Sequence, residues 1–222
     1  MTQIDQGTIN YRDELVRKLI HLCSLAIPVI YYFIPRTSAI IILSILTLVA
    51  ILLDLSRYFY PSVGKIFYKI FGFLLRRHEV DHKKKNLNGA TYVLISALIC
   101  VIIFPKIFFV TAFPILIISD SSAALIGRKF GKHKFLAKSL EGTLAFFISA
   151  SIVVLFTPKI ENNSAEYLIG FIAAAIGAIV ENVSFGFADD NLSIPISISL
   201  TMWGLYLLLL PGLPLILPGA PM

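Results

Sequence analysis

The most informative residue of the sequence is Asp120, which lies just beyond the apolar run Ile107–Ile118. A run of this kind can cross a membrane, and a carboxylate at that depth costs roughly 2.5–3.5 kcal/mol. Membrane proteins keep such groups where they bind ions, protons or substrate, so that a functional role is favoured over a silent ion pair. Asp120 is therefore the first candidate for a catalytic group or a metal ligand.

Small residues follow Asp120 at intervals of four. If one helix continues through this segment, Ala123, Gly127 and Gly131 lie on a single stripe of its surface. Such a stripe lets a ligand approach the backbone, but it also serves as a packing face between membrane helices. The first alternative makes Gly127 and Gly131 candidates for nucleotide contact, with Arg128 beside them for phosphates.

The segment Lys138–Thr143 has the composition of a helix start. Free backbone N–H groups at a helix N-terminus attract phosphate, and Lys138 adds a full positive charge. A structural alternative is equally supported, with Ser139 as the N-cap and Glu141 opposing the helix dipole. On the functional alternative, the candidates for nucleotide contact are Lys138, Ser139, Gly142 and Thr143, and Glu141 is a candidate metal ligand.

An acidic and amide-rich segment precedes the last apolar run. Its members are Glu181, Asn182, Asp189, Asp190 and Asn191. Carboxylate and amide oxygens suit hard cations such as Mg²⁺. We expect the three carboxylates to bind the metal and the two amides to contact the nucleotide; the alternative is a solvated acidic loop.

A basic group lies near the N-terminus. Arg17 and His21 are four residues apart and share one helix face, with Lys18 beside them. Taken alone, this group is more typical of the positive charges that anchor a membrane helix at its cytoplasmic end.

The composition identifies the elements that must position these groups. The chain is 57% hydrophobic and 14% charged, with a mean hydropathy of +0.85, whereas soluble domains are about a quarter charged. We predict an all-α, polytopic membrane helical bundle, formed by a single domain over residues 1–222. The seven predicted membrane helices are Leu19–Ile34, Thr37–Leu53, Ala90–Phe104, Ile107–Ile126, Thr143–Phe156, Tyr167–Val183 and Ile194–Leu210. The segment Phe59–Arg77 has the spacing of an amphipathic helix in the cytoplasmic interface.

Positive charges are distributed unevenly among the predicted loops. Most lie before the first helix or after the second and fourth, including Lys83, Lys84 and Lys85. The alternate loops carry only Arg36, Lys106 and Lys159. By the positive-inside rule, the N-terminus and the candidate residues face the cytoplasm, and the C-terminus lies outside.

The candidate groups all fall at the predicted cytoplasmic ends of helices. Carboxylates, basic side chains and a helix N-terminus on one face are suited to holding a polyphosphate with Mg²⁺, and phosphoryl transfer depends mainly on positioning and charge neutralisation. The spacing of a P-loop is absent, and no nucleic-acid partner is expected. A membrane transporter would also explain buried carboxylates, but its acidic residues are expected near the middle of the bilayer.

Four motifs follow one another along the chain. They are Arg17-Lys18-x-x-His21, Asn88-Gly89-Ala90-x-Tyr92, the run D-x-x-A-x-x-x-G-x-x-x-G from Asp120 with K-S-x-E-G-T from Lys138, and Glu181 with Asp189-Asp190-Asn191-x-x-x-Pro195. The ordered set resembles the membrane family of CTP-dependent lipid kinases, which includes dolichol kinases, phytol kinases and CTP-dependent diacylglycerol kinases. The resemblance spans Arg17 to Pro195, which is most of the chain.

The resemblance implies that CTP donates its γ-phosphoryl group, with Mg²⁺ or another divalent cation, to the hydroxyl of a membrane lipid alcohol. That alcohol would be a polyprenol, a phytol-like alcohol or diacylglycerol. The implied catalytic residues are Asp120, Arg17, Lys18 and His21, with Asn88 and Gly89 at the nucleotide. A phosphatidate cytidylyltransferase-like transferase is the main alternative, but the chain is short and lacks that family's long C-terminal Gly-Asp signature. The expected partners are a nucleoside triphosphate, the lipid alcohol and the bilayer, and an oligomer is compatible with the sequence.

Overall fold

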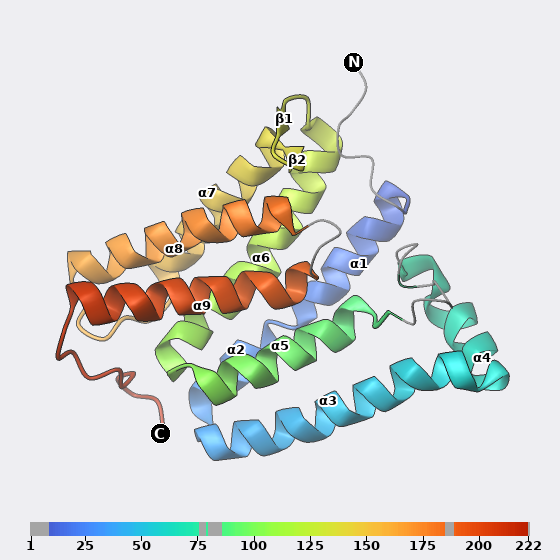
Figure 1. Cartoon of the computed structure of the whole chain (residues 1–222), viewed down its shortest axis with the longest axis horizontal. Helices are drawn as coiled ribbons and strands as arrows, with labels where there is room; N and C mark the ends of the chain where they lie inside the picture. Colours follow the sequence, from blue (N-terminus) through green and yellow to red (C-terminus); the bar gives the residue numbers. More distant parts are fainter. Residues whose placement is uncertain (1–8, 76–78, 80–85, 185–188, 222) are drawn as a thin grey trace.

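The computed structural model describes residues 9–75, 79, 86–184 and 189–221 (Figure 1). Of the predicted features, Arg76, Arg77 and the lysines 83–85 lie outside the described residues. The elements in chain order are α1 (Tyr11–Cys23), α2 (Ala26–Phe33), α3 (Arg36–Phe59), α4 (Pro61–Phe71), the 3₁₀ turn η1 (Gly72–Leu74), α5 (Gly89–Ile103), α6 (Lys106–Phe130), β1 (Lys134–Phe135), β2 (Lys138–Ser139), α7 (Leu140–Phe156), α8 (Ser164–Val183) and α9 (Asp190–Leu209). The two strands form a short antiparallel hairpin between α6 and α7.

The helices have the lengths and composition of membrane segments. In the described part of the chain, five segments are long and apolar enough to cross a membrane: α1 together with α2, then α3, α6, α8 and α9. The helices α5 and α7 are apolar but shorter. The prediction of an all-α, polytopic membrane helical bundle is therefore confirmed, and the protein is an integral membrane protein.

The first membrane segment differs from its predicted bounds. It begins at Tyr11 rather than at Leu19, and a turn at Ser24 interrupts it between α1 and α2. The interruption is explained by proline, because Pro28 has no N–H to donate to the carbonyl of Ser24, four residues earlier. The early start was missed because charged residues lower the hydropathy of the first turns, although Lys18 among them is only 4% exposed.

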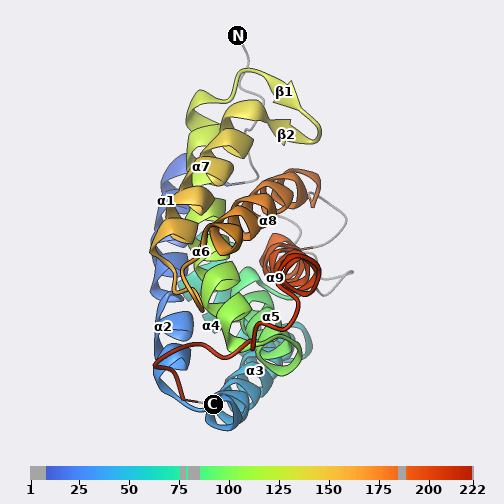
Figure 2. The same ribbon diagram turned by 90° about the vertical axis from the view of Figure 1, so that its left-hand side faces the viewer.

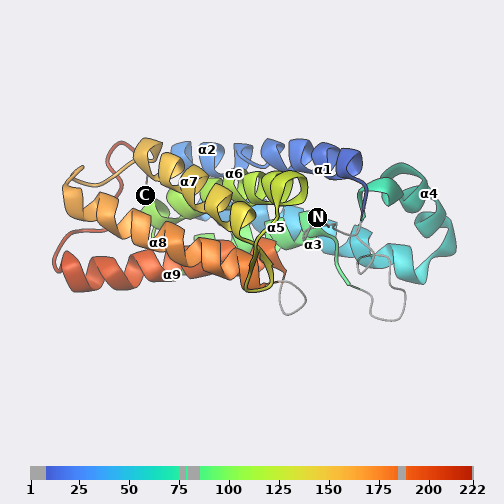
Figure 3. The ribbon, with the colours of Figure 1, turned by 90° about the horizontal axis from the view of Figure 1, so that it is seen from above.

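A proline separates α3 from α4. The helix α3 continues to Phe59, beyond its predicted end at Leu53, and Pro61 occupies the first turn of α4. Proline is favoured there because a helix leaves the first N–H groups without partners. The predicted interfacial helix Phe59–Arg77 is thus α4 followed by η1, with α4 packed on the end of α3 (Figure 3).

The central helix of the bundle is α6, which packs against α7, α9, α1, α2 and α5 (Figure 2). Of its apolar stretch 67% is buried, compared with 22% for α3. A helix that is apolar around its whole circumference is expected in the interior, whereas α3 presents its apolar side chains outward to lipid. Asp120 therefore belongs to the most enclosed helix of the protein.

The basic residues of the alternate loops have structural partners at the end of the bundle opposite to Asp190. The Arg36 guanidinium donates to the carbonyl of Val101 at 2.9 Å, and the Lys106 ammonium donates to that of Ile34 at 2.8 Å. The Val101 carbonyl lies in the last turn of α5, and Ile34 is the C-cap of α2; at helix ends, backbone acceptors have no partner within the helix. Cations in these loops accordingly cap helix ends.

Candidate active site

A cavity of about 440 Å³ lies between α1, α4–η1 and the N-terminal ends of α5 and α9. One side of it is polar and contains residues predicted from four separate segments of the sequence. The predicted site residues that line it are Arg17, Lys18, His21, Asn88, Gly89, Asp120, Asp190 and Asn191. The residues that line it from the segment α4–η1 and Leu75 are all apolar, namely Phe67, Phe71, Leu74 and Leu75, so that charged groups and an apolar wall share one cavity.

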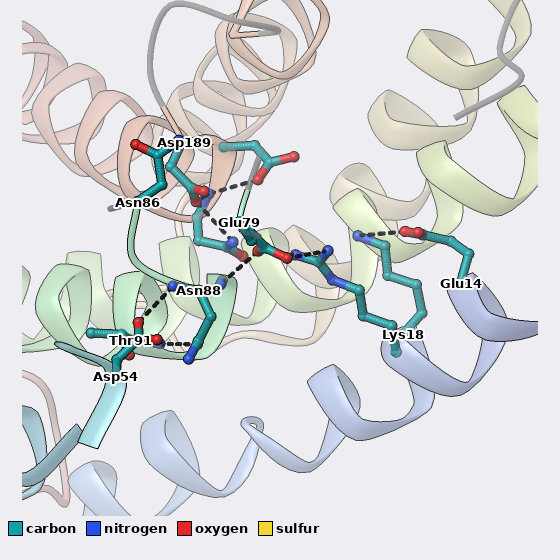
Figure 4. Close-up of polar contacts among 12 residues, drawn as sticks. Glu14, Lys18, Asp54, Glu79, Asn86, Asn88, Thr91 and Asp189 are labelled. Atoms are coloured by element: carbon teal, nitrogen blue, oxygen red, sulfur yellow. Dashed lines mark hydrogen bonds and ion pairs between the residues drawn. The ribbon is translucent and has the colours of Figure 1, made fainter. Parts of the chain in front are cut away.

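Asp120 is 2% exposed and forms an ion pair with α1. Its Oδ2 lies 2.5 Å from the Lys18 Nζ, which in turn lies 4.0 Å from Glu14 Oε1 (Figure 4). Arg128 Nη2 lies 3.4 Å from the other oxygen of Glu14, so that charges alternate along the α1–α6 contact. The ion pair compensates the burial of Asp120, and both partners still line the cavity.

His21 also lines the cavity. Its Nε2 atom is buried and has no hydrogen-bond partner among the described residues. Buried polar atoms without a partner are rare in native proteins because each one costs about 1–3 kcal/mol. An imidazole nitrogen kept in this state is available to a ligand in the cavity.

Glu79 is a site residue that the sequence did not reveal. It is 1% exposed, and its Oε1 lies 3.3 Å from Arg17 Nη2 and accepts the Gly89 N–H at 2.9 Å (Figure 4). It therefore holds the Arg17 guanidinium against the first turn of α5. In the sequence Glu79 is one acidic residue beside a basic loop, and no local pattern links it to Arg17.

Asn88 and Asp54 fix the start of α5. The Asn88 side chain accepts the N–H of Thr91 at 3.0 Å and so caps the helix, while the Asn88 N–H donates to Asp54 Oδ2 at 2.7 Å. Asp54 also pairs with Arg57 Nε at 3.0 Å. Sequence reasoning placed Asp54 beyond the end of a helix, although it is a buried residue of α3.

The residues of the late acidic motif have two different positions in the structure. Asp189 is the N-cap of α9, and its Oδ1 accepts the backbone N–H of Asn191 at 3.0 Å and the Asn191 side-chain amide at 2.9 Å. Asp190 and Asn191 are 8% and 4% exposed and line the cavity. Asp190 is thus the carboxylate of this motif that faces the same space as Asp120.

A second polar cluster adjoins this site at the β1–β2 hairpin. Lys138 Nζ lies 2.5 Å from Glu181 Oε1, and the Asn182 side chain accepts the Lys138 N–H at 3.0 Å and donates to Thr143 Oγ1 at 2.7 Å. Burial lowers the pKa of Lys138, but the Glu181 carboxylate, followed by Asp190, more than offsets burial, so that the pKa is raised above its ordinary value. Lys138 therefore stays positively charged beside the cavity.

The predicted glycines lie at the α6–α7 contact. A Cβ on Gly142 would lie 3.1 Å from the carbonyl oxygen of Ala123 and 3.3 Å from Gly127 Cα, and one on Gly131 would clash with Gly127 O and Ser139. These positions require glycine because the two backbones approach so closely. The packing alternative thus accounts for their spacing, and their contact with a nucleotide stays a prediction.

Ser139 ends β2, and Glu141 lies in the first turn of α7. Ser139 is the N-cap, with its Oγ accepting the Gly142 N–H at 3.3 Å. Glu141 Oε1 lies 2.7 Å from His133 Nδ1, and both side chains are partly solvated. Glu141 does not line the cavity with Asp120 and Asp190, so its role as a metal ligand stays a prediction.

Within residues 9–75, 79, 86–184 and 189–221, no group of three or more His, Cys, Asp or Glu side chains is arranged to hold a metal ion. Mg²⁺, however, is commonly bound by one or two carboxylates together with substrate phosphates and water. Asp120 and Asp190 line one cavity and supply oxygen donors of that type. The donor set therefore fits a Mg²⁺ ion that arrives with a nucleotide.

Comparison with known proteins places the chain in a family. An uncharacterized protein of Rickettsia prowazekii is 30% identical over 195 residues, covering 87% of this chain and 95% of that protein. CTP-dependent diacylglycerol kinase 1 of Schizosaccharomyces pombe is 29% identical over 156 residues, covering 64% and 70%. A dolichol kinase of the same yeast is 37% identical over 90 residues, covering 39% and 17%. No protein-family model matches the chain, and no solved structure gives a significant match. The chain therefore belongs to one family with the uncharacterized Rickettsia protein, and it is similar at lower identity or coverage to a CTP-dependent diacylglycerol kinase and to a dolichol kinase.

Proposed function

We propose that this protein is a CTP-dependent kinase that transfers the γ-phosphoryl group to the hydroxyl of a membrane lipid alcohol. The observation that carries the proposal is the cavity, which joins a charged site containing Asp120 to an apolar space. A soluble acceptor would not need the apolar side, and a transporter of ions would not need the paired cations. CTP as the donor and a lipid as the acceptor agree with the names of two relatives.

The charged site and the polar cluster that adjoins it together contain three pairs of a cation and a carboxylate. They are Arg17–Glu79 at 3.3 Å, Lys18–Asp120 at 2.5 Å and Lys138–Glu181 at 2.5 Å. In phosphoryl transfer, cations bind phosphate oxygens, and carboxylates bind the divalent cation that neutralises the phosphates. The nucleotide and its metal would each take one partner of such pairs, so that no buried charge is left alone when both bind.

The roles at the reacting atoms follow from position. Arg17 and Lys18 would bind the transferred phosphoryl group, and Asp120 and Asp190 would hold Mg²⁺, which supplies positive charge at the phosphates when bound. The acceptor hydroxyl would donate its proton to the unpartnered His21 Nε2. Its oxygen then forms the new bond to the γ-phosphorus, the bond to the β-phosphate oxygen breaks, and CDP leaves.

We also place this site at the cytoplasmic face. The support is the charge distribution, since α1, which carries Arg17 and Lys18, and the β1–β2 hairpin, which carries Lys138, both lie away from the C-terminus (Figure 1). The C-terminal segment lies at the opposite end and would be outside. Labelling of single introduced cysteines with an impermeant reagent in sealed, oriented vesicles tests this; labelling of both ends from one side contradicts it.

The reaction is tested with purified protein, a panel of lipid alcohols and labelled nucleotide. Label from the γ position of CTP should appear in the lipid, and ATP in parallel determines the donor preference. Label from the α position in the lipid would instead establish a cytidylyltransferase and refute the kinase. Asp120→Asn should abolish lipid phosphorylation, while Glu161→Gln, at an exposed position in the loop between α7 and α8, serves as the matched control.

A further inference from the structure

We propose that the chain of the acceptor lipid lies in the apolar half of the cavity, and that α4–η1 is the wall that determines which acceptors fit. This inference rests on the proposed function and adds to it the site and the selecting residues of the second substrate. The wall is formed by Phe67 and Phe71 of α4, Leu74 of η1 and Leu75.

The apolar half is continuous with the charged site. Ile20 of α1 and Ile27 of α2 line the cavity on either side of His21 and Ser24 in sequence, and Val93 of α5 lines it beyond Gly89. A lipid alcohol also combines a polar and an apolar part, with one hydroxyl at the end of a hydrocarbon chain. With its hydroxyl at His21, its chain would lie against α4–η1.

The two faces of α4 differ in a way that fits this role. Phe67 and Phe71 line the cavity with their rings 5.3 Å apart, and Phe71 is 46% exposed; Ile66 and Ile70 do not line the cavity and are 62% and 52% exposed. Outward apolar residues with interspersed lysines are typical of a helix lying in the membrane interface. The helix therefore covers the cavity with one face and contacts lipid with the other.

Arg57 holds this wall in place. Its guanidinium lies 4.9 Å from the centre of the Phe67 ring, and the residue is 2% exposed. A Cβ on Gly64 would lie 2.8 Å from the Arg57 carbonyl oxygen, which shows how closely α4 approaches the end of α3. Because Arg57 also pairs with Asp54, which binds the Asn88 N–H, the lipid wall and the nucleotide side share one support.

The size of the cavity limits how much of the lipid it can bind. About 440 Å³ is at the lower end of the ~300–1,000 Å³ of ordinary ligand sites, too small for a whole membrane lipid. Only the segment next to the hydroxyl would enter, and the rest of the chain would remain in the bilayer. Selectivity should therefore depend on the width of that first segment and little on total chain length.

The test uses Phe67→Ala and Phe71→Ala, with Ile66→Ala and Ile70→Ala on the outward face as matched controls. We expect the two wall variants to raise the KM for the lipid alcohol by roughly 10-fold or more, and to relax the discrimination between narrow and wide acceptors. The KM for CTP should be unchanged, and the controls should behave as wild type. Phe67→Leu keeps the wall apolar and guards against a variant that fails to fold.

A second measurement needs no catalysis. A long-chain alcohol with a photoreactive diazirine near its hydroxyl should label residues of α4–η1 or α5, and unlabelled alcohol should compete. Labelling elsewhere, or wall variants that match their controls in KM and selectivity, would overturn the inference. Competable labelling of α4–η1 without any phosphorylation would instead refute the proposed kinase while leaving the lipid site in place.

Discussion

Gly89→Ala is the change with the most specific expected effect. A Cβ at this position would lie 2.6 Å from Arg17 Nη2 and 3.3 Å from Asn191 Nδ2. Because optimal contacts between such atoms are about 3.5–4.0 Å, the guanidinium must move by roughly 1 Å. A displacement of that size at a group that positions the reactants costs on the order of 100-fold in rate, or about 2.7 kcal/mol. The helix itself should gain from alanine, since Gly→Ala at a compatible site stabilises by about 0.4–1 kcal/mol.

The two effects have opposite signs and are measured separately. Initial rates of lipid phosphorylation in detergent should fall about 100-fold, while the thermal unfolding midpoint should stay the same or rise. Gly204→Ala is the control, because no atom lies within 4 Å of its Cβ position. In an Arg17→Ala background the change at Gly89 should cost nothing further, if it acts through Arg17. Additive losses in that double variant would refute the reasoning.

Three further predictions concern stability and charge. Gly170→Ala would bring a Cβ within 2.5 Å of Val154 Cγ1 and should lower the stability by about 1–3 kcal/mol. Val154→Ala in the same chain should recover much of this loss. If the decreases in unfolding midpoint of the two single variants simply add in the double variant, the contact is contradicted. Lys159→Met should lower the unfolding midpoint, because Nζ donates to the Val154 carbonyl at 2.6 Å and a charged hydrogen bond contributes about 1.5–3 kcal/mol. An unchanged midpoint would show that water replaces this hydrogen bond in the variant. The pKa of Lys138 is raised because Glu181 more than offsets burial, so the pair stabilises the fold fully below about pH 10.4, and this contribution is lost as the pH rises through the folded-state pKa. Carbon NMR of the dimethylated lysine should place the titration midpoint of Lys138 above that of an exposed lysine, and Glu181→Gln should lower this midpoint. A wild-type midpoint at or below that of exposed lysines contradicts the assignment.

Most of the fold follows from local properties of the sequence. Apolar runs bounded by Pro35, Pro105 and Pro158 predict the membrane helices, because hydropathy and helix termination depend on residues close in the chain. The errors also have a local cause. The first turns of α1 were left out because Lys18 makes them polar, yet the structure buries Lys18 through a partner that lies 102 residues away, Asp120.

In the candidate site, too, some residues were predictable from local sequence and others depended on contacts between distant segments. The motifs contained Arg17, Asp120 and Asp190 because unusual residue types at membrane ends are visible in sequence. Glu79 could not be found in this way, since its importance comes from Arg17, 62 residues earlier, and from the backbone of Gly89. The glycine stripe was compatible with helix packing and with nucleotide contact, and only the structure shows the close approach of α7 to α6 at these positions.

The sequence by itself thus determined the membrane class, most helices and the residue types of a phosphoryl-transfer site. Only the tertiary structure decided which of these residues meet, because side-chain contacts depend on how the helices cross and in which register they pack. It paired each cation of the site with a carboxylate from a distant segment, and it set the apolar face of α4 over the cavity. Hydropathy reports that a helix is amphipathic, but the packing of α4 on α3 determines what its inner face covers.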